Sequence, residues 1–568
     1  MLRTLLLSLF LLGSLPQDKT PRKLEWKLAP GHAAEYLYLD RAGKPIPDQK
    51  LLLFASELTP TANRLAIDTY EQLPLAFIFQ LPPEPIKGGV GWEYTSYHFN
   101  DAYDALGGFD YLGAGSLRPL FAKGRYIAKF QKKGDEDLAL IDGAFSLVEI
   151  RRDMVNNQMK VIVTKNELGT LATSVQFNMS KGLVQKAAWQ YKIKAQDREG
   201  GRIVDKRSET HQMIELKEDA ELDAAKVQPA VETSMARAVE WLRKQQKNGV
   251  WNTAKPGPGA ALEGVAQTSV VVRALIAAGV KPDDPAIAAA SRTLRSAPPP
   301  ETFVLCQQIF ALAAKSPTKE EADDLKRFSE ELLKRRDPRT GGWPSLAGRN
   351  NEVASSFLTG YALEALTLSP DARIPDETLR RGLEFFSGSW IEDDGKVDLD
   401  LETEKDATTV VPDPKKDKDL VPATWPALVG VQQATDLRAG RKGSFFSVVA
   451  ALRALLLLPE RLKMDEKQVK NLELPIKKGL ANLQLRWTLR SVPPIEAFWC
   501  TQRMEYLGLL GPTLARAKID RIGGSDWRVE GAMLLLREQG EDGSWFSGTD
   551  QAVVKTAHAL IFLASAKR

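Results

Sequence analysis

Carboxylate and amide side chains that could act in catalysis or binding lie after Gly-x-Trp turns in the C-terminal part of the chain. They stand where apolar segments begin. Carboxylates and amides gathered around one opening could carry out general acid–base chemistry or bind a polar ligand. These candidate binding residues are Glu263, Gln267, Asn350, Asn351, Glu352, Glu496, Asp550 and Gln551. The simpler interpretation is that they cap helices and face water, and we favour it.

Lys555 and His558 are a second candidate pair, because residues three apart share one face of a helix. A partly buried pair of this kind is more often a packing detail than a catalytic dyad. The chain has 2 cysteines and 4 histidines in scattered positions, so we predict no metal site and no cofactor. For Cys306 and Cys500 we favour two buried free thiols over a disulfide.

The segments that carry these residues have a helical period from residue 230 onward. Met235, Val239 and Leu242 recur on one face among charged neighbours, which indicates an amphipathic outer helix. Residues 265–278 are apolar on nearly all sides, with Arg273 as their one charge, which indicates a buried inner helix. The alternation continues along the chain and predicts an α/α toroid of about six or seven helical hairpins over residues 230–568.

The N-terminal part has a period of two instead. Val175, Phe177 and Met179 alternate with polar residues, as in a sheet with one buried face. We therefore predict a multidomain α and β protein, with an antiparallel β-rich, half-barrel-like domain over residues 22–216. Residues 217–229 are expected to be a linker. Residues 391–426, which are rich in charge and proline, are expected to be an insertion loop on the toroid.

The first 16 residues resemble a signal peptide, because Arg3 precedes an apolar run that is too short to span a bilayer. We expect a secreted or periplasmic protein, which stays membrane-associated if the signal is not cleaved, and no transmembrane segment after signal removal. The 77 basic and 73 acidic residues nearly balance, which argues against nucleic acid as a partner.

A repeated motif joins the outer helices to the turns. Its first copy has Arg237, Ala238, Trp241, Leu242 and Gln246 on a helix, and then a Gly249-x-Trp251 turn. The last copy has Gln539, Gly543 and Trp545, and residues 339–343 keep only the turn, with Gly342 and Trp343. Glycine allows the backbone conformation of a helix end, and tryptophan covers the turn with a large apolar ring. We therefore interpret these residues as structural.

This pattern resembles the QW motif of the terpenoid cyclase and protein prenyltransferase toroid superfamily. The resemblance covers residues 230–568 and implies the α/α toroid fold. It leaves the N-terminal domain unassigned, and it does not fix function, because the superfamily hosts several chemistries.

The catalytic signatures of these relatives do not occur in the sequence. The acid motif Asp-x-Asp-Asp of class II cyclases is missing, and the nearest approach is Asp398-Leu399-Asp400-Leu401. The prenyltransferase zinc set fails because Phe498 and Val304 stand where an Asp would precede each Cys. The thioester motif Gly-Cys-Gly-Glu-Gln is also missing.

We therefore identify no catalytic residue and predict an exported, non-catalytic binding or interaction scaffold. The alternative is a diverged toroid enzyme, either terpenoid cyclase-like or active on a polysaccharide. The corresponding ligand would be an isoprenoid, a glycan or a protein. An aromatic-lined apolar pocket with one strongly perturbed acid would favour cyclase-like chemistry, and an open cleft with paired carboxylates would favour carbohydrate chemistry.

Overall fold

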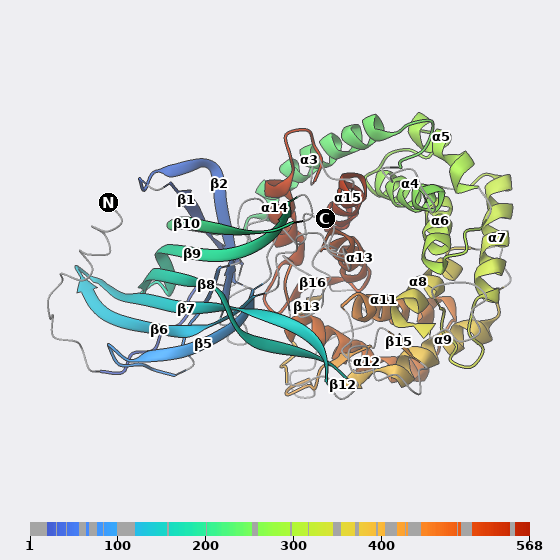
Figure 1. The fold of residues 1–568 in the computed structure, drawn as a ribbon. Helices are drawn as coiled ribbons and strands as arrows, with labels where there is room; N and C mark the ends of the chain where they lie inside the picture. Colours follow the sequence, from blue (N-terminus) through green and yellow to red (C-terminus); the bar gives the residue numbers. More distant parts are fainter. Residues whose placement is uncertain are drawn as a thin grey trace. The chain divides into compact units, whose positions relative to one another are not determined.

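The chain divides into two compact units in the computed structural model (Figure 1). One comprises Met1–Val155 and Met159–Glu221, and the other comprises Asn156–Gln158 and Leu222–Arg568. The described residues are 20–29, 31–40, 42–55, 64–67, 77–82, 84–98, 120–155, 158–199, 202–252, 260–295, 298–315, 317–344, 354–369, 374–392, 396–403, 417–425, 428–429, 445–485, 487–489, 503–545 and 551–567.

The first unit contains an antiparallel sheet of eight strands in the order β2-β1-β10-β9-β8-β7-β6-β5. Its strands are β1 (His32–Leu39), β2 (Pro45–Phe54), β5 (Gly91–His98), β6 (Leu120–Lys133), β7 (Glu136–Val155), β8 (Gln158–Asn178), β9 (Leu183–Glu199) and β10 (Arg202–Glu221). A separate hairpin pairs β3 (Arg64–Ile67) with β4 (Phe77–Gln80). The predicted antiparallel sheet is thus present.

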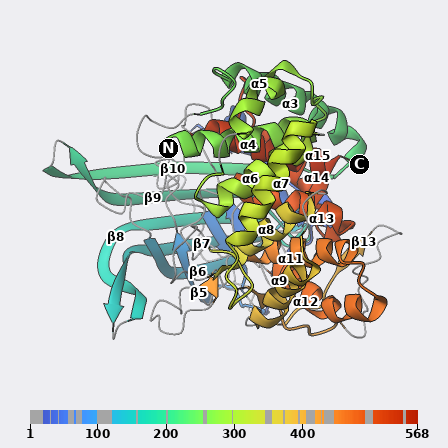
Figure 2. The same cartoon turned by 90° about the vertical axis from the view of Figure 1, so that its right-hand side faces the viewer.

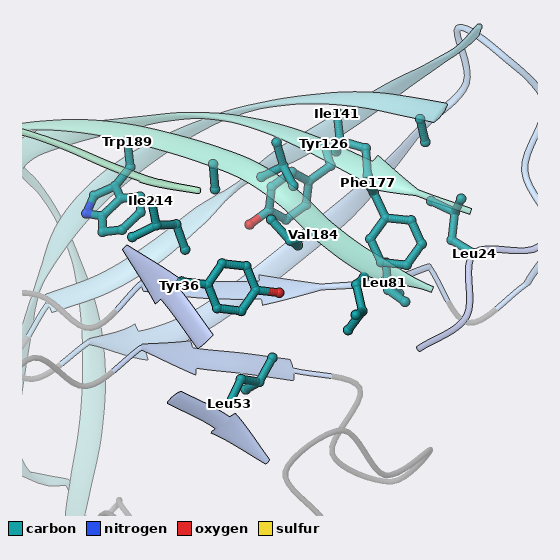
Figure 3. Packing of buried hydrophobic residues seen from close by; sticks show 14 of the residues in the cluster. Leu24, Tyr36, Leu53, Leu81, Tyr126, Ile141, Phe177, Val184, Trp189 and Ile214 are labelled. Atoms are coloured by element: carbon teal, nitrogen blue, oxygen red, sulfur yellow. The ribbon is translucent and has the colours of Figure 1, made fainter. Parts of the chain in front are cut away.

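One face of this sheet forms the core of the unit. Tyr36, Tyr126, Phe177 and Trp189 are all buried there and point into a shared interior, as Figure 3 shows. The rings of Tyr126 and Phe145 meet edge to face with centroids 4.9 Å apart. The alternation of period two therefore puts large side chains on the inner face, as the sequence predicts.

The second unit is a closed ring of helices. Among the described residues, six inner helices are α4 (Ala260–Ala277), α6 (Thr302–Ala314), α8 (Ser356–Thr367), α11 (Phe445–Arg461), α13 (Arg503–Arg516) and α15 (Ala552–Ala566). Six outer helices are α3 (Ala224–Gln245), α5 (Pro285–Leu294), α7 (Lys319–Lys334), α9 (Asp376–Ser389), α12 (Glu466–Leu485) and α14 (Trp527–Glu538). Each inner helix contacts the next, and α15 contacts α4, so the ring closes (Figure 1).

Burial separates the two kinds of helix in the way the periodicity predicts. Helix α7 buries one stripe that includes Leu325, Phe328 and Leu332, whereas α6 is buried along most of its length. Helix α4 is long and apolar enough to cross a membrane, although the sequence suggested no such segment after the N-terminus. It packs against α5, α6 and α15, which identifies it as a core helix of the ring; Figure 2 shows these helices from a second direction.

The tryptophans of the repeated motif bind the outer helices. The indole N–H of Trp251 donates to the Leu242 carbonyl at 2.6 Å, and that of Trp545 donates to the Leu535 carbonyl at 2.9 Å. Trp343 makes the equivalent bond to an α7 carbonyl at 2.7 Å. All three rings are fully buried. The structural interpretation of the motif follows from these bonds, since each indole is satisfied locally.

A threonine on the following inner helix completes each of these joints. The backbone N–H of Trp251 donates to Thr268 Oγ1 at 3.1 Å, and that of Trp343 donates to Thr359 Oγ1 at 3.0 Å. Trp545 does the same with Thr556 at 3.0 Å. We call this pair of bonds, indole to outer helix and threonine to backbone, the tryptophan joint. It fixes the height of an inner helix relative to its outer partner.

The first glycine of each turn has a left-handed backbone, with φ of +79° at Gly249, +80° at Gly341 and +93° at Gly543. Gly341, and not the predicted Gly342, is therefore the equivalent of Gly249. Gly342 is confined for another reason: a Cβ there would lie 2.7 Å from the Ala354 Cβ. Because Gly341 and Gly342 are consecutive, the sequence alone did not show which of them has the left-handed backbone.

The last turn closes the ring against the first outer helix. Gln539 Nε2 donates to the Ser234 carbonyl at 2.9 Å, and Arg237 donates to the carbonyls of Gly540 and Glu541, each at 2.7 Å. Gly543 lies directly on this helix, because a Cβ there would meet the Arg237 carbonyl oxygen at 2.8 Å. In the first copy, Gln246 binds the Ala286 carbonyl of α5 in the same manner, at 2.7 Å.

The expected linker over residues 217–229 is largely regular structure. Strand β10 continues to Glu221 in register with β1, and α3 begins at Ala224 with Asp223 as its N-cap. Pro229 stands within the first turns of α3. The acidic residues and the proline suggested a linker. They are also compatible with the end of strand β10 and the start of helix α3.

The charged insertion is also more ordered than the sequence suggests, within its described residues 391–392, 396–403 and 417–425. Its strand β13 (Leu401–Thr403) pairs with β16 (Ile519–Ile522), and β12 (Ile391–Glu392) pairs with β14 (Ala423–Thr424). Asp417 makes a buried 2.8 Å ion pair with Lys477. Trp425 donates its indole N–H to the Phe386 carbonyl at 2.8 Å, as the motif tryptophans do toward their outer helices.

The close approach at Gly543 generates a stability prediction. Gly543→Ala should lower the free energy of unfolding by about 3 kcal/mol, because it adds left-handed strain and a clash with the Arg237 carbonyl. Gly279→Ala is the matched control, since Gly279 has φ of +88° but open space around it; we expect a loss of about 1 kcal/mol. Urea unfolding measures both, and equal losses would contradict a tight ring closure at Gly543.

Candidate functional site

Three of the eight residues predicted at the mouth of the toroid can be located. Glu263 lies exposed in the first turn of α4 and accepts a 2.9 Å hydrogen bond from Gln267, which is buried. Gln551 is exposed at the start of α15 and makes no side-chain capping bond. The other five lie outside the described residues, and these are Asn350, Asn351, Glu352, Glu496 and Asp550.

Lys555 and His558 both lie buried on the inner helix α15. His558 packs so closely on α13 that a Cβ at Gly508 would lie 2.4 Å from its Nδ1. Burial and the charge of Arg273 lower the pKa of His558 to about 3, so the imidazole is neutral at physiological pH. The pair therefore supplies one cationic group and one neutral ring.

The most distinctive polar residues of the interior are three that the sequence analysis did not select. Arg273 on α4, Glu364 on α8 and Arg453 on α11 stand among apolar neighbours on inner helices. The signal was available, because a single charge in an otherwise apolar helix must face a polar partner or a solvated interior. Arg273 was noted for that isolation, but not interpreted as functional.

These residues form one polar layer. Arg453 Nη2 is ion-paired with Glu364 Oε1, and Arg273 Nη1 donates to Gln307 Oε1 at 2.6 Å. The Arg273 guanidinium also stacks over the Phe310 ring at 4.5 Å from its centroid. The tryptophan joints place this layer, since Arg273 and Glu364 each stand five residues after a joint threonine, Thr268 or Thr359.

The layer behaves as a desolvated electrostatic cluster. Burial lowers the pKa of Arg273, and the nearby Glu364 carboxylate acts in the opposite direction. Burial raises the pKa of Tyr361 to about 12, with Arg273 opposing the shift. Cys306 lies fully buried nearby, where burial raises the pKa of its thiol, so it is not a reactive thiolate. Cys500 lies outside the described residues.

A second ionisable group, Glu505, lies near the start of α13. Burial raises the pKa of its carboxyl to about 7, which its own backbone N–H and the positive charge of Lys555 only partly offset. Its Oε2 atom is buried and meets no hydrogen-bond partner within the described ranges. Glu505 is thus partly protonated at neutral pH, in surroundings different from those of Glu364.

An aromatic layer lies on the same inner helices. Phe357 contacts Tyr361 with centroids 4.6 Å apart, Phe303 at 5.9 Å and Phe446 at 5.7 Å. Phe446 in turn meets the ring of Tyr506 on α13 at 6.1 Å. Phe303 and Phe357 stay partly exposed although they sit on inner helices.

Among residues that the structure describes, no three His, Cys, Asp or Glu side chains gather where they could hold a metal ion. Glu364 is ion-paired with Arg453, whereas the positive charge of Lys555 acts on Glu505. A glycosidase needs two carboxyl groups that flank one bond.

No protein-family model matches the chain, and no curated protein sequence matches it. A type II terpene cyclase from Scytonema is 12% identical with a TM-score of 0.35, over 61% of this chain and 99% of the other. An unsaturated glucuronyl hydrolase specific for heparin is 12% identical with a TM-score of 0.38, over 60% and 96%. A family 76 glycoside hydrolase from a bovine Bacteroides thetaiotaomicron strain is 9% identical with a TM-score of 0.37, over 77% and 97%. Similarities of this size do not bear on what this chain binds.

Glu505 should make the stability of the protein depend on pH. Its pKa is about 7 in the folded protein against 4.5 for an ordinary glutamate, so the folded state binds more protons between these pH values. The contribution of Glu505 to the free energy of unfolding therefore falls as pH rises through this window, by up to about 3 kcal/mol. Urea unfolding of wild type and Glu505→Gln from pH 4 to 8 measures it. Parallel pH profiles would contradict the burial of this carboxyl.

Proposed function

We propose that the helical unit is a non-catalytic binding scaffold that holds a small ligand inside its ring. The observation that carries this proposal is the pair of partly exposed rings, Phe303 and Phe357, on neighbouring inner helices. Exposed aromatic faces directed into a protein's interior are typical of ligand sites, because a filled core would bury them completely. An isoprenoid chain or a sugar ring would pack on such faces. A protein ligand would have to insert a side chain or a terminus.

The charges of the interior argue against cyclase-like chemistry. A carbocation formed beside Arg273 and Arg453 would be repelled by two cationic groups, and desolvation strengthens that repulsion. The Glu364 carboxylate is also ion-paired with Arg453, which keeps it ionised and unable to donate a proton. These groups fit binding better than proton transfer to an alkene.

The enzyme alternative has one observation in its favour. Glu505 is a single carboxyl with a pKa of about 7, close to the aromatic residue Tyr506. A group that is half protonated at neutral pH is suited to general acid–base catalysis. It is too weak an acid to protonate an isolated alkene, so this alternative favours an easier proton transfer, such as one on a polysaccharide.

Export remains part of the proposal. Residues 1–16 have the charge and apolar pattern of a signal peptide, which would deliver the scaffold to the periplasm or outside the cell. The scaffold would then bind its ligand in the periplasm or outside the cell.

The proposal predicts that the purified protein retains a ligand. Solvent extraction followed by mass spectrometry should recover one compound in near-stoichiometric amount from the wild type. Phe357→Ala should lower the recovery about 10-fold, since it removes an aromatic face worth roughly 1–2 kcal/mol. Phe328→Leu, on the buried side of the outer helix α7, is a control that should keep the ligand.

Two results would contradict the scaffold. One is equal recovery from the Phe357→Ala protein, which would place the compound elsewhere. The other is turnover of the recovered compound by wild type that Glu505→Gln abolishes, which would establish the enzyme alternative.

A further inference from the structure

The interior of the ring is built in two layers at a constant spacing. On two inner helices an aromatic residue is followed seven positions later by a charged member of the polar layer, Phe357 by Glu364 and Phe446 by Arg453. On α6, Phe303 is followed seven positions later by Phe310, on whose ring Arg273 of the polar layer stacks. Seven residues make two helical turns, so each pair shares a helix face and is about 10 Å apart along it. Three neighbouring inner helices thus present an aromatic layer and a polar layer in the same order.

The polar layer has more positive than negative charge. Within the described residues, Arg273 and Arg453 are its cations and Glu364 is its carboxylate. The neighbouring His558 adds no charge, because its pKa is about 3. Arg273 and Arg453 are partly buried. A partly buried guanidinium whose charge is not balanced is unfavourable, and a bound anion would stabilise it.

The same layer also has hydrogen-bond donors that are not used. Arg453 is bound through Nη2, while its Nε and Nη1 atoms are buried and meet no partner within the part of the chain that the structure describes. The amide Nε2 of the fully buried Gln307 side chain also meets no hydrogen-bond partner among the described residues. Buried donors of this kind are normally satisfied, so they indicate a ligand or water that occupies the layer.

We infer that the ligand is an amphiphilic anion: an anionic head group binds Arg453 in the polar layer, and an aromatic or aliphatic body packs on Phe303 and Phe357. The 10 Å between the layers sets the distance between head and body. The inference rests on the proposed function, because it names the chemistry of the ligand that the scaffold would hold. Glu364, which is ion-paired with Arg453, competes with such an anion for the guanidinium.

Two fluorescent probes that differ only in charge test this inference. 1-Anilinonaphthalene-8-sulfonate carries a sulfonate, and N-phenyl-1-naphthylamine has the same aromatic body without it. The full-length protein, stripped of ligand, should bind the sulfonate probe about 10- to 100-fold more tightly, which is the effect of a charged hydrogen bond in a desolvated site. Fluorescence titration gives both dissociation constants.

Variants locate the effect. Arg453→Met should remove the preference and leave the affinity for the neutral probe unchanged. Glu364→Gln should tighten binding of the sulfonate probe several-fold, since it removes the competing carboxylate. Phe357→Ala should weaken both probes. The control is Arg516→Met on α13, an arginine whose ion pair with Glu460 is exposed, and it should change neither constant.

The outcomes separate the inference from the function on which it rests. Equal affinity of wild type for the two probes would overturn the anionic head group, and so would a preference that survives Arg453→Met. An unchanged sulfonate affinity in Glu364→Gln would do the same even where Arg453→Met fails to fold. Failure of both probes to bind wild type would contradict the scaffold itself.

Discussion

The tryptophan joint is the interaction on which the helical ring depends. Each joint uses one indole N–H to satisfy a carbonyl near the end of an outer helix, and one threonine hydroxyl to satisfy the backbone N–H of the same tryptophan. The carbonyl and the backbone N–H would otherwise be buried and unpaired, because Leu242 and Trp251 are both fully buried. Orphaned groups at helix ends are costly, so the joint stabilises the turn and also sets where the next inner helix begins.

The order of the ring interior follows from those fixed heights. Because Thr268 and Thr359 occupy equivalent positions, Arg273 and Glu364, each five residues later, come to equivalent depths. The aromatic layer is set by the same origin, since Phe357 stands two residues before its joint threonine. The tryptophan joints, which have a structural role, thus determine which side chains can meet on the inner helices. Loss of a joint would shift a whole helix and not one contact.

The sequence predicted the fold better than the site, and the reason is physical. Helical period, turn glycines and tryptophans are local signals, and they were enough to predict a ring of paired helices. The same signals failed inside the charged insertion, where Trp425 has no Gly-x-Trp turn before it and yet donates its indole N–H to the Phe386 carbonyl of an outer helix. The candidate site was chosen from polar residues at helix starts, and Glu263 and Gln551 proved exposed. Arg453 and Glu364 were missed, because only the closed ring brings residues so distant in sequence together.

An unbalanced, partly buried charge on the inner helices is the feature that most constrains function. Hydrophobic residues would fill the ring at lower electrostatic cost, since a buried ion pair seldom adds stability over a packed apolar equivalent. Two guanidinium groups with one carboxylate are less favourable still, and the unused donors of Arg453 add to that cost. A ring that only joined other parts of the protein would have no need of this arrangement. Binding sites characteristically have residues that lower the stability of the fold. The partly exposed aromatic rings lie two helical turns from the charged residues, and they give the direction in which the body of an anionic ligand would extend.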